Sequence, residues 1–193
     1  ISEVSPSLNY EFDSLQSAGV DLVMSDDGLF RIYSWDTWQG GTMHDFTVAY
    51  QYKYKDKVYG MLAVDTAMPE SERYLPFYSQ IFTLKTERAT YYLAIYNGIY
   101  STKDASQGVR AFTIKNGRLI DANIFMTKRL RSTINCYFDF FRVLDRPERP
   151  LKLIKYDGKT KTLYIPIVHE DGQVTSKFIT YRFNGKYFER VKG

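Results

Sequence analysis

The segment VRAFTIKNGRLIDANIF, residues 109–125, decides the fold class. Two runs rich in β-branched and aromatic residues, 109–115 and 118–125, flank the pair Asn116-Gly117. Asparagine and glycine tolerate positive φ, which the two-residue type I′ turn of a β-hairpin requires at both central positions. The segment therefore predicts a tight antiparallel hairpin. We expect the same turn at Asn184-Gly185, between the runs 174–183 and 186–191.

The rest of the chain repeats this pattern of β-rich runs and short turns. Three further turns contain an Asp-Gly pair, and strands that are joined by tight turns become antiparallel neighbours. The sequence therefore predicts an all-β, antiparallel meander of about a dozen strands. The further runs expected to form strands are 20–25, 29–35, 46–54, 57–64, 77–86, 89–101, 137–144, 151–156 and 161–169.

Two longer connections, 65–76 and 126–136, divide the strands into three four-stranded groups. Such groups are typical of a partial propeller or a barrel-like arrangement. Helix is expected only at the N-terminal end, where Ser5 or Ser7 is a candidate cap and Gly19 a stop. The predicted organisation is an N-terminal helical segment, 1–19, followed by a single antiparallel β domain, 20–193.

Composition excludes several classes of partner. Lys and Arg outnumber Asp and Glu by 26 to 22, and the only tight basic cluster is at 127–131, so no nucleic-acid partner is expected. Cys136, the one cysteine, lies among aromatic residues and is expected in the core. No apolar run reaches the roughly 18 residues of a membrane span. No cofactor is expected, and the domain is expected to be a monomer.

The stretch SDDGLFRIYSWDTWQGGTMHDF, residues 25–46, contains both tryptophans and the best candidate binding site. Strand alternation places Trp35 on one face with Arg31 and Tyr33, so Trp35 is expected to be structural. Trp38 follows the strand end and is the expected exposed contact. Asp36 and His44 add a carboxylate and an imidazole, which with an indole could bind a sugar ring. The alternative is that the indoles cap a core and Asp36 accepts turn N–H groups.

A second set of candidates follows from charged residues elsewhere. Arg146 and Arg149 could hold a carboxylate or phosphate, or could pair with nearby Glu148 or Asp145. Two isolated histidines, His44 and His169, do not have metal-ligand spacing, so no metal site is expected. Glycoside hydrolysis needs two carboxyl groups about 5–9.5 Å apart. Candidates for such a pair are Asp139, Asp145 and Glu148 with Asp36 or Asp45.

Two resemblances bear on function. Residues 25–46 resemble a WD-repeat blade, but the pattern occurs once, whereas a propeller repeats it about every 40–45 residues. The succession SDDGLFRIYSWDT, QGGTMHDF, YYLAIYNGIYSTKDASQGVRAF, RPERPLKLIKYD and TLYIPIVHEDGQVTSKFITYRFNGKYFE resembles a family of uncharacterised bacterial all-β proteins associated with export. This resemblance implies an exported location, in the periplasm or on the outer surface, and no particular activity.

These observations lead to two hypotheses of function. The first is a non-enzymatic binding or interaction domain of the bacterial cell envelope, with a glycan or an envelope protein as partner. The alternative is an exported hydrolase that acts on glycans through paired carboxylates.

Overall fold

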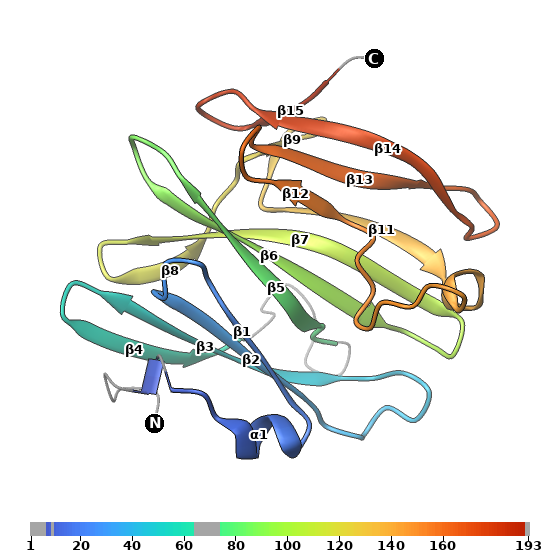
Figure 1. Ribbon diagram of the computed structural model, residues 1–193, viewed down its shortest axis with the longest axis horizontal. Helices are drawn as coiled ribbons and strands as arrows, with labels where there is room; N and C mark the ends of the chain where they lie inside the picture. The colour runs from blue at the N-terminus through green and yellow to red at the C-terminus, as the bar shows by residue number, and fades with distance from the viewer. Residues whose placement is uncertain (1–6, 9, 64–73, 192–193) are drawn as a thin grey trace.

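The computed structural model describes residues 7–8, 10–63 and 74–191, and these form three predominantly antiparallel sheets (Figure 1). The first sheet is a simple meander in the order β1-β2-β3-β4 and confirms the first predicted group. Its strands are β1 (Val20–Met24), β2 (Phe30–Asp36), β3 (Phe46–Tyr54) and β4 (Lys57–Leu62).

The central sheet has the order β11-β7-β6-β5, and β8 also pairs with β7. The C-terminal sheet has the order β10-β9-β15-β14-β13-β12, with one parallel pairing, between β15 and β9. The central strands are β5 (Phe77–Lys85), β6 (Thr90–Ile99), β7 (Asp104–Lys115), β8 (Arg118–Asp121) and β11 (Thr133–Asp139). The C-terminal strands are β9 (Phe125–Met126), β10 (Leu130–Arg131), β12 (Lys155–Asp157), β13 (Thr162–Val168), β14 (Val174–Phe183) and β15 (Phe188–Arg190).

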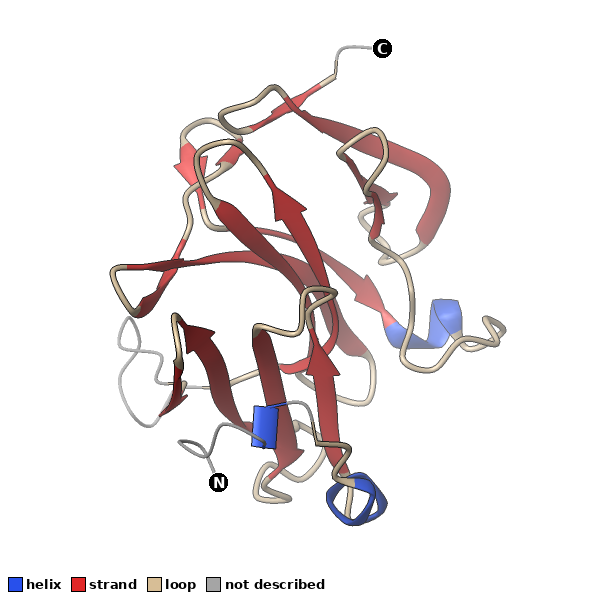
Figure 2. Cartoon of the chain, turned by 60° about the vertical axis from the view of Figure 1, so that its left-hand side comes forward, coloured by secondary structure: helices blue, strands red, loops and turns tan. Residues whose placement is uncertain are grey.

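The central sheet is buried on both faces because each neighbouring sheet covers one of them. Along β6, Tyr92 and Ala94 face the core shared with the first sheet, whereas Leu93 and Ile95 face the core shared with the C-terminal sheet. Strands β1 and β2 also lie against β5, so the sheets curl as a half-barrel. The all-β prediction and its barrel-like alternative are confirmed, and Figure 2 shows helix only in short pieces.

The predicted boundary of the third group is wrong. We expected a strand at 137–144, but β11 ends at Asp139 and a 3₁₀-helix, η3 (Phe140–Val143), follows it. The Asp139 side chain accepts a hydrogen bond from the Phe141 amide and so caps that helix. Strand β11 belongs to the central sheet, and the predicted connection 126–136 contributes to β9, β10 and β11. Most of the other predicted connection, 65–76, lies outside the described residues.

The expected strand at 151–156 is also largely wrong, since only its end belongs to β12. The reason is the side chain of Gln107, which is fully buried. Its Oε1 accepts from the amides of Leu153 and Ile154 at 2.9 and 2.8 Å, and its Nε2 donates to the Leu151 carbonyl at 2.6 Å. One side-chain amide therefore replaces the backbone ladder along this segment.

The two Asn-Gly turns differ. Asn116 and Gly117 have φ values of 53° and 76° and join β7 to β8 as a two-residue hairpin, as predicted. At Asn184-Gly185 only the glycine has positive φ, and the loop has four residues, so that prediction is wrong. The Asn184 Oδ1 accepts from the amides of Lys186 and Tyr187 and closes the longer loop.

The N-terminal helix is shorter than predicted. It spans α1 (Asp13–Ser17), and its N-cap residue, Phe12, makes no side-chain cap hydrogen bond. Ser5 lies outside the described residues. Ser7 does not cap this helix because its hydroxyl accepts from Gln51 on β3, and its carbonyl accepts from Arg31 on β2. These bonds fasten residue 7 to the outer face of the first sheet.

Candidate functional site

The loop between β2 and β3 presents the Trp38 indole to solvent, as predicted. Trp38 is 81% exposed, more than any other large hydrophobic side chain in the described part of the chain. Its φ is 58°, a left-handed conformation that is unfavourable for a bulky side chain. The Asp36 Oδ1 accepts from the Trp38 amide at 2.8 Å and holds this conformation. The indole is thus exposed on a backbone that is fixed.

His44 contacts both Asp36 and Trp38, the two residues that the sequence grouped with it. Its Nδ1 is hydrogen-bonded to the Asp36 Oδ2, and its ring meets the Trp38 indole edge to face, with 5.9 Å between ring centroids. The other end of the loop is fixed as well. The His44 amide donates to the Ile99 carbonyl at the end of β6, and Asp45 accepts from the Leu75 amide. The structure therefore brings Asp36, Trp38 and His44 together as one pre-organised loop.

Trp35 occupies a different environment. It is half-buried on the outer face of the first sheet and lines an apolar hollow of about 380 Å³ together with Leu15, Tyr33 and Leu62. It belongs to none of the core clusters of the described residues. The predicted sharing of one face by Tyr33 and Trp35 is confirmed, but Trp35 does not cap the core.

Arg146 and Arg149 do not join this loop. The Arg149 guanidinium donates to the backbone carbonyls of Leu144, Arg146 and Glu148. Among the ion pairs of the described residues neither arginine takes part, so the expected pairing with the Glu148 or Asp145 carboxylate is wrong. Arg149 holds the connector together instead of presenting its donors to a ligand.

The candidate catalytic carboxylates are distributed over separate places. Asp139 caps η3, lies 3.6 Å from the Lys103 ammonium and lines a hollow of about 430 Å³. Neither Asp36 nor Asp45 lines this hollow, so the pairings expected from the sequence are not formed there. The carboxylates that do line it come from the start of β7, the end of β11 and the β13–β14 connection: Asp104, Asp139, Glu170 and Asp171.

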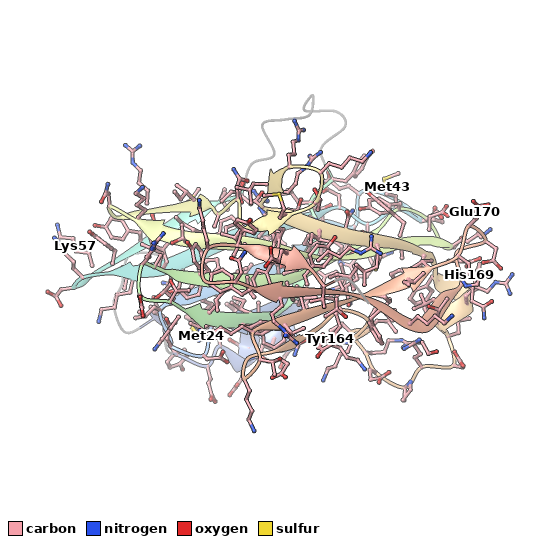
Figure 3. All side chains as sticks on the ribbon, turned by 90° about the horizontal axis from the view of Figure 1, so that it is seen from above. Met24, Met43, Lys57, Tyr164, His169 and Glu170 are labelled. Atoms are coloured by element: carbon pink, nitrogen blue, oxygen red, sulfur yellow. The ribbon has the colours of Figure 1, made fainter. Side chains whose placement is uncertain are left out.

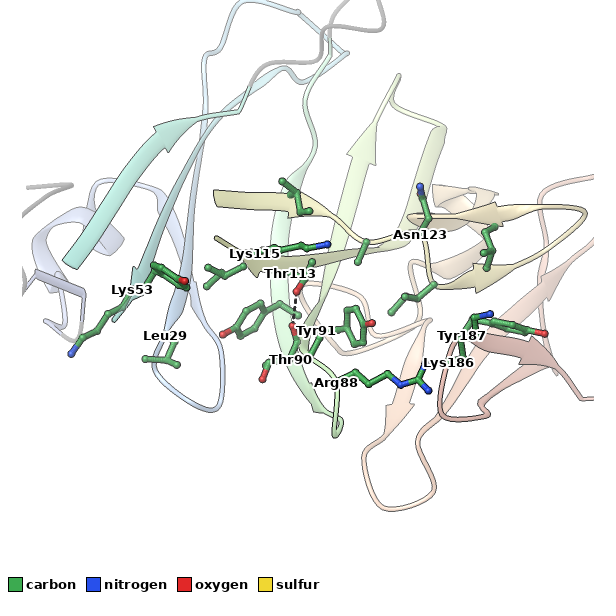
Figure 4. A pocket seen from close by; sticks show the side chains of 18 of the residues that line it. Leu29, Lys53, Arg88, Thr90, Tyr91, Thr113, Lys115, Asn123, Lys186 and Tyr187 are labelled. Carbon is green, nitrogen blue, oxygen red and sulfur yellow. Dashed lines mark hydrogen bonds between the residues drawn. The ribbon is translucent and has the colours of Figure 1, made fainter. Parts of the chain in front are cut away.

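A further hollow, which we call the basic hollow, was not predicted from the sequence. It has a volume of about 700 Å³, and it forms where turns of all three sheets meet (Figure 4). This hollow lies at the opposite end of the molecule from the other two sites. Figure 3 shows Lys57, beside the β3–β4 turn that lines the hollow, at one end, and Met43, His169 and Glu170 at the other. The lining of the basic hollow contains five cationic side chains: Lys53, Lys55, Arg88, Lys115 and Lys186. They are scattered over more than 130 residues of sequence, so no local pattern indicates them.

Two titratable groups have environments that define their chemical role. Burial raises the pKa of the Tyr92 phenol, which lines the basic hollow, and the Asp27 carboxylate that accepts its hydrogen bond raises it further. This phenol therefore stays neutral. Burial raises the pKa of the Cys136 thiol to about 11, and Cys136 packs in the core as predicted.

Within the described ranges, no group of three His, Cys, Asp or Glu side chains is placed to hold a metal ion. No helix in the same residues has the length and apolar character that crossing a membrane requires. Comparison with known proteins found no matching family model, no similar curated protein and no similar solved structure.

Proposed function

We propose that this chain is a non-enzymatic binding domain of the bacterial cell envelope and that Trp38 is its principal contact. The observation that carries the proposal is an exposed indole on a fixed backbone. Exposure of so large an apolar surface contributes nothing to folding, and positive φ at a bulky residue costs about 1–3 kcal/mol. Both features disfavour stability, and a contact role accounts for both.

The chemistry around Trp38 suits a glycan better than a small apolar ligand. An indole face packs against the apolar face of a sugar ring, and neighbouring polar groups bind its hydroxyls. Asp36 keeps one free lone pair on each carboxylate oxygen beyond its bonds to Trp38 and His44. Because the loop is already ordered, binding would require little further loss of conformational entropy.

Intrinsic fluorescence tests this contact directly. In a Trp35→Phe variant Trp38 is the sole indole, and titration with soluble peptidoglycan fragments should shift its emission to shorter wavelength. Trp38→Ala should abolish binding and leave the melting temperature unchanged. Phe141→Ala, which removes another exposed aromatic side chain, is the matched control and should bind normally. An unchanged emission with every fragment would refute the glycan proposal.

The envelope location is proposed from the resemblance to exported bacterial proteins. Fractionation of the native cells into cytoplasm, periplasm and membranes tests it, with recovery outside the cytoplasm expected. Recovery in the cytoplasm alone would contradict the location and leave the proposed contact at Trp38 unaffected.

One observation favours a second candidate, the exported glycan hydrolase. The hollow that contains Asp139 also presents Glu170 and Tyr137, which is 63% exposed. Release of reducing ends from a glycan, lost in a Glu170→Gln variant and retained in Trp38→Ala, would establish this candidate. Absence of any such release would contradict the hydrolase and favour the non-enzymatic binding domain.

A further inference from the structure

The five cationic side chains of the basic hollow come from turns that lie far apart in the chain. Lys53 and Lys55 come from the β3–β4 hairpin, and Lys115 from the end of β7 in the β7–β8 hairpin. Arg88 comes from the β5–β6 turn and Lys186 from the β14–β15 loop. Figure 4 labels four of them, Lys53, Arg88, Lys115 and Lys186, among the residues that line the hollow. The fold therefore concentrates at one place a charge that the sequence disperses.

This concentration is large compared with the charge of the whole protein. The chain has a net charge of +4, whereas the hollow alone has five cationic groups and no Asp or Glu in its lining. Ion pairs among the described residues involve none of the five. Like charges that share a concave surface repel one another and raise the local positive potential. An anion bound among them would remove this repulsion.

The uncharged part of the lining points to the same kind of ligand. The lining also includes uncharged residues whose side chains can donate hydrogen bonds: Tyr54, Thr90, Tyr91, Asn123 and Tyr187. The nearby Asp27 carboxylate is not part of the lining, and it accepts hydrogen bonds from the Ser25 and Tyr92 hydroxyls and from the Leu29 amide. A lining rich in donors and without carboxylates fits a ligand whose oxygens only accept.

The backbone at Lys55 gives a further, independent observation. Lys55 has a φ of 55° in a two-residue turn, a position that glycine or asparagine adopts with less strain. Its ammonium group lies 5.6 Å from the centroid of the Tyr54 ring, at the hollow. Strain of this kind is concentrated at ligand-binding positions. A lysine at this position fits a role for its charge.

We propose that the basic hollow is a second binding site, separate from Trp38, for a small anion that carries several phosphate or sulfate groups. A volume of about 700 Å³ lies within the range of small-ligand sites, roughly 300–1,000 Å³. A single phosphate is too small to contact cations from four different turns, so several anionic groups are needed. The ligand binds through its charges and through the tyrosine, threonine and asparagine donors between them.

The test uses two lysines that have the same strained backbone. Lys55→Asn removes a cation of the hollow, and asparagine tolerates positive φ, so the variant should be at least as stable as the wild type. Lys161 has a φ of 50° in the β12–β13 turn and lines a different hollow. Lys161→Asn is therefore the matched control for both the backbone and the net charge.

Binding is measured by calorimetry with inorganic tripolyphosphate, a sulfated disaccharide and inorganic phosphate, at low and at physiological salt. Tripolyphosphate or the disaccharide should bind at least about tenfold more tightly than phosphate, and Lys55→Asn should weaken that binding about fivefold or more. A Lys115→Gln, Lys186→Gln double variant should weaken it further, and Lys161→Asn should not weaken it.

Three results would overturn the proposal. One is the absence of binding by both multivalent anions, and another is equal weakening by Lys55→Asn and Lys161→Asn, which would indicate an effect of net charge alone. The third is tighter binding of a single-stranded oligothymidylate than of either small anion, which would assign the hollow to nucleic acid. None of these results bears on the contact at Trp38, because the readout here involves no indole.

Discussion

Replacement of Gln107 by leucine should destabilise the protein by about 2–8 kcal/mol, although the two side chains have similar volumes. Gln107 is fully buried and makes four hydrogen bonds through one amide group. Leucine would leave the amides of Leu153 and Ile154 and the carbonyl of Leu151 without their partner. Each buried polar group that loses its partner costs about 1–3 kcal/mol, and the added apolar surface of leucine offsets about 1 kcal/mol.

Urea unfolding followed by tryptophan fluorescence measures this loss as a lower midpoint at an unchanged slope. For a chain of this length each kcal/mol lost lowers the melting temperature by about 2–4 °C, so the drop should be at least about 4 °C. Gln173→Leu is the control: Gln173 is exposed, so its replacement should stay within about 0.5 kcal/mol of the wild type. Amide hydrogen exchange should speed up most at residues 151–154 in the Gln107 variant.

A loss below about 1 kcal/mol would refute the reasoning, because it would mean that segment 151–154 finds other partners or is not buried in solution. Equal losses at Gln107 and Gln173 would refute it in another way, since the effect would then come from leucine itself. A large loss with unchanged exchange at 151–154 would show that Gln107 acts through Asn97 and not through this segment.

Three further changes test individual features. Gly172→Ala should lower the free energy of unfolding by about 2 kcal/mol or more, because φ is 81° and the new Cβ would lie 2.7 Å from the Asp139 amide nitrogen. Gly185→Ala is the control in thermal melts, because its φ is 98° but its Cβ would meet open space, so it measures the backbone strain alone. Gly117→Val should cost about 1–2 kcal/mol in urea unfolding because a β-branched residue is strained at φ 76°, and a neutral result would contradict the hairpin geometry. At pH 8 the folded Cys136 thiol should react with iodoacetamide at least about a hundredfold more slowly than in denaturant, because burial raises its pKa from 9.0 to about 11. The same raised pKa makes unfolding easier above about pH 9, because only the unfolded thiol loses its proton there. Rapid alkylation of the folded protein would show that the thiol is accessible.

The sequence was sufficient for features that depend on neighbouring residues. The alternation of side chains along β2 and the Asn116-Gly117 hairpin are local, and so is the grouping of Asp36, Trp38 and His44, which lie within nine residues. Such features follow from backbone geometry and short-range hydrogen bonds, which a linear pattern contains. The exposure of Trp38 was predictable for this reason.

Features that depend on distant contacts could not be predicted. The residues 151–154 have the composition of a strand, but Gln107, more than 40 positions earlier, takes up their hydrogen-bonding groups. The dipeptide Asn184-Gly185 matches Asn116-Gly117 in sequence, yet the Asn184 side chain closes a longer loop. The basic hollow gives no local signal at all, because its cations converge only when the three sheets assemble.

Backbone strain separates the two proposed sites from the rest of the surface, but only in combination with exposure and charge. Four non-glycine residues of the described chain have positive φ: Trp38, Lys55, Asn116 and Lys161. Asparagine adopts this conformation readily, so Asn116 is explained by its turn alone. Trp38 and Lys55 would be less strained as asparagine or glycine, and each presents its side chain at a proposed site. Lys161 shows why strain is not sufficient, since its strain is the same while the hollow that it lines also contains Asp26 and Asp27. We expect Lys55→Asn and Lys161→Asn to stabilise the fold equally, and only Lys55→Asn to weaken anion binding. That result would show that the protein tolerates the strain at Lys55 because the charge of this residue binds a ligand.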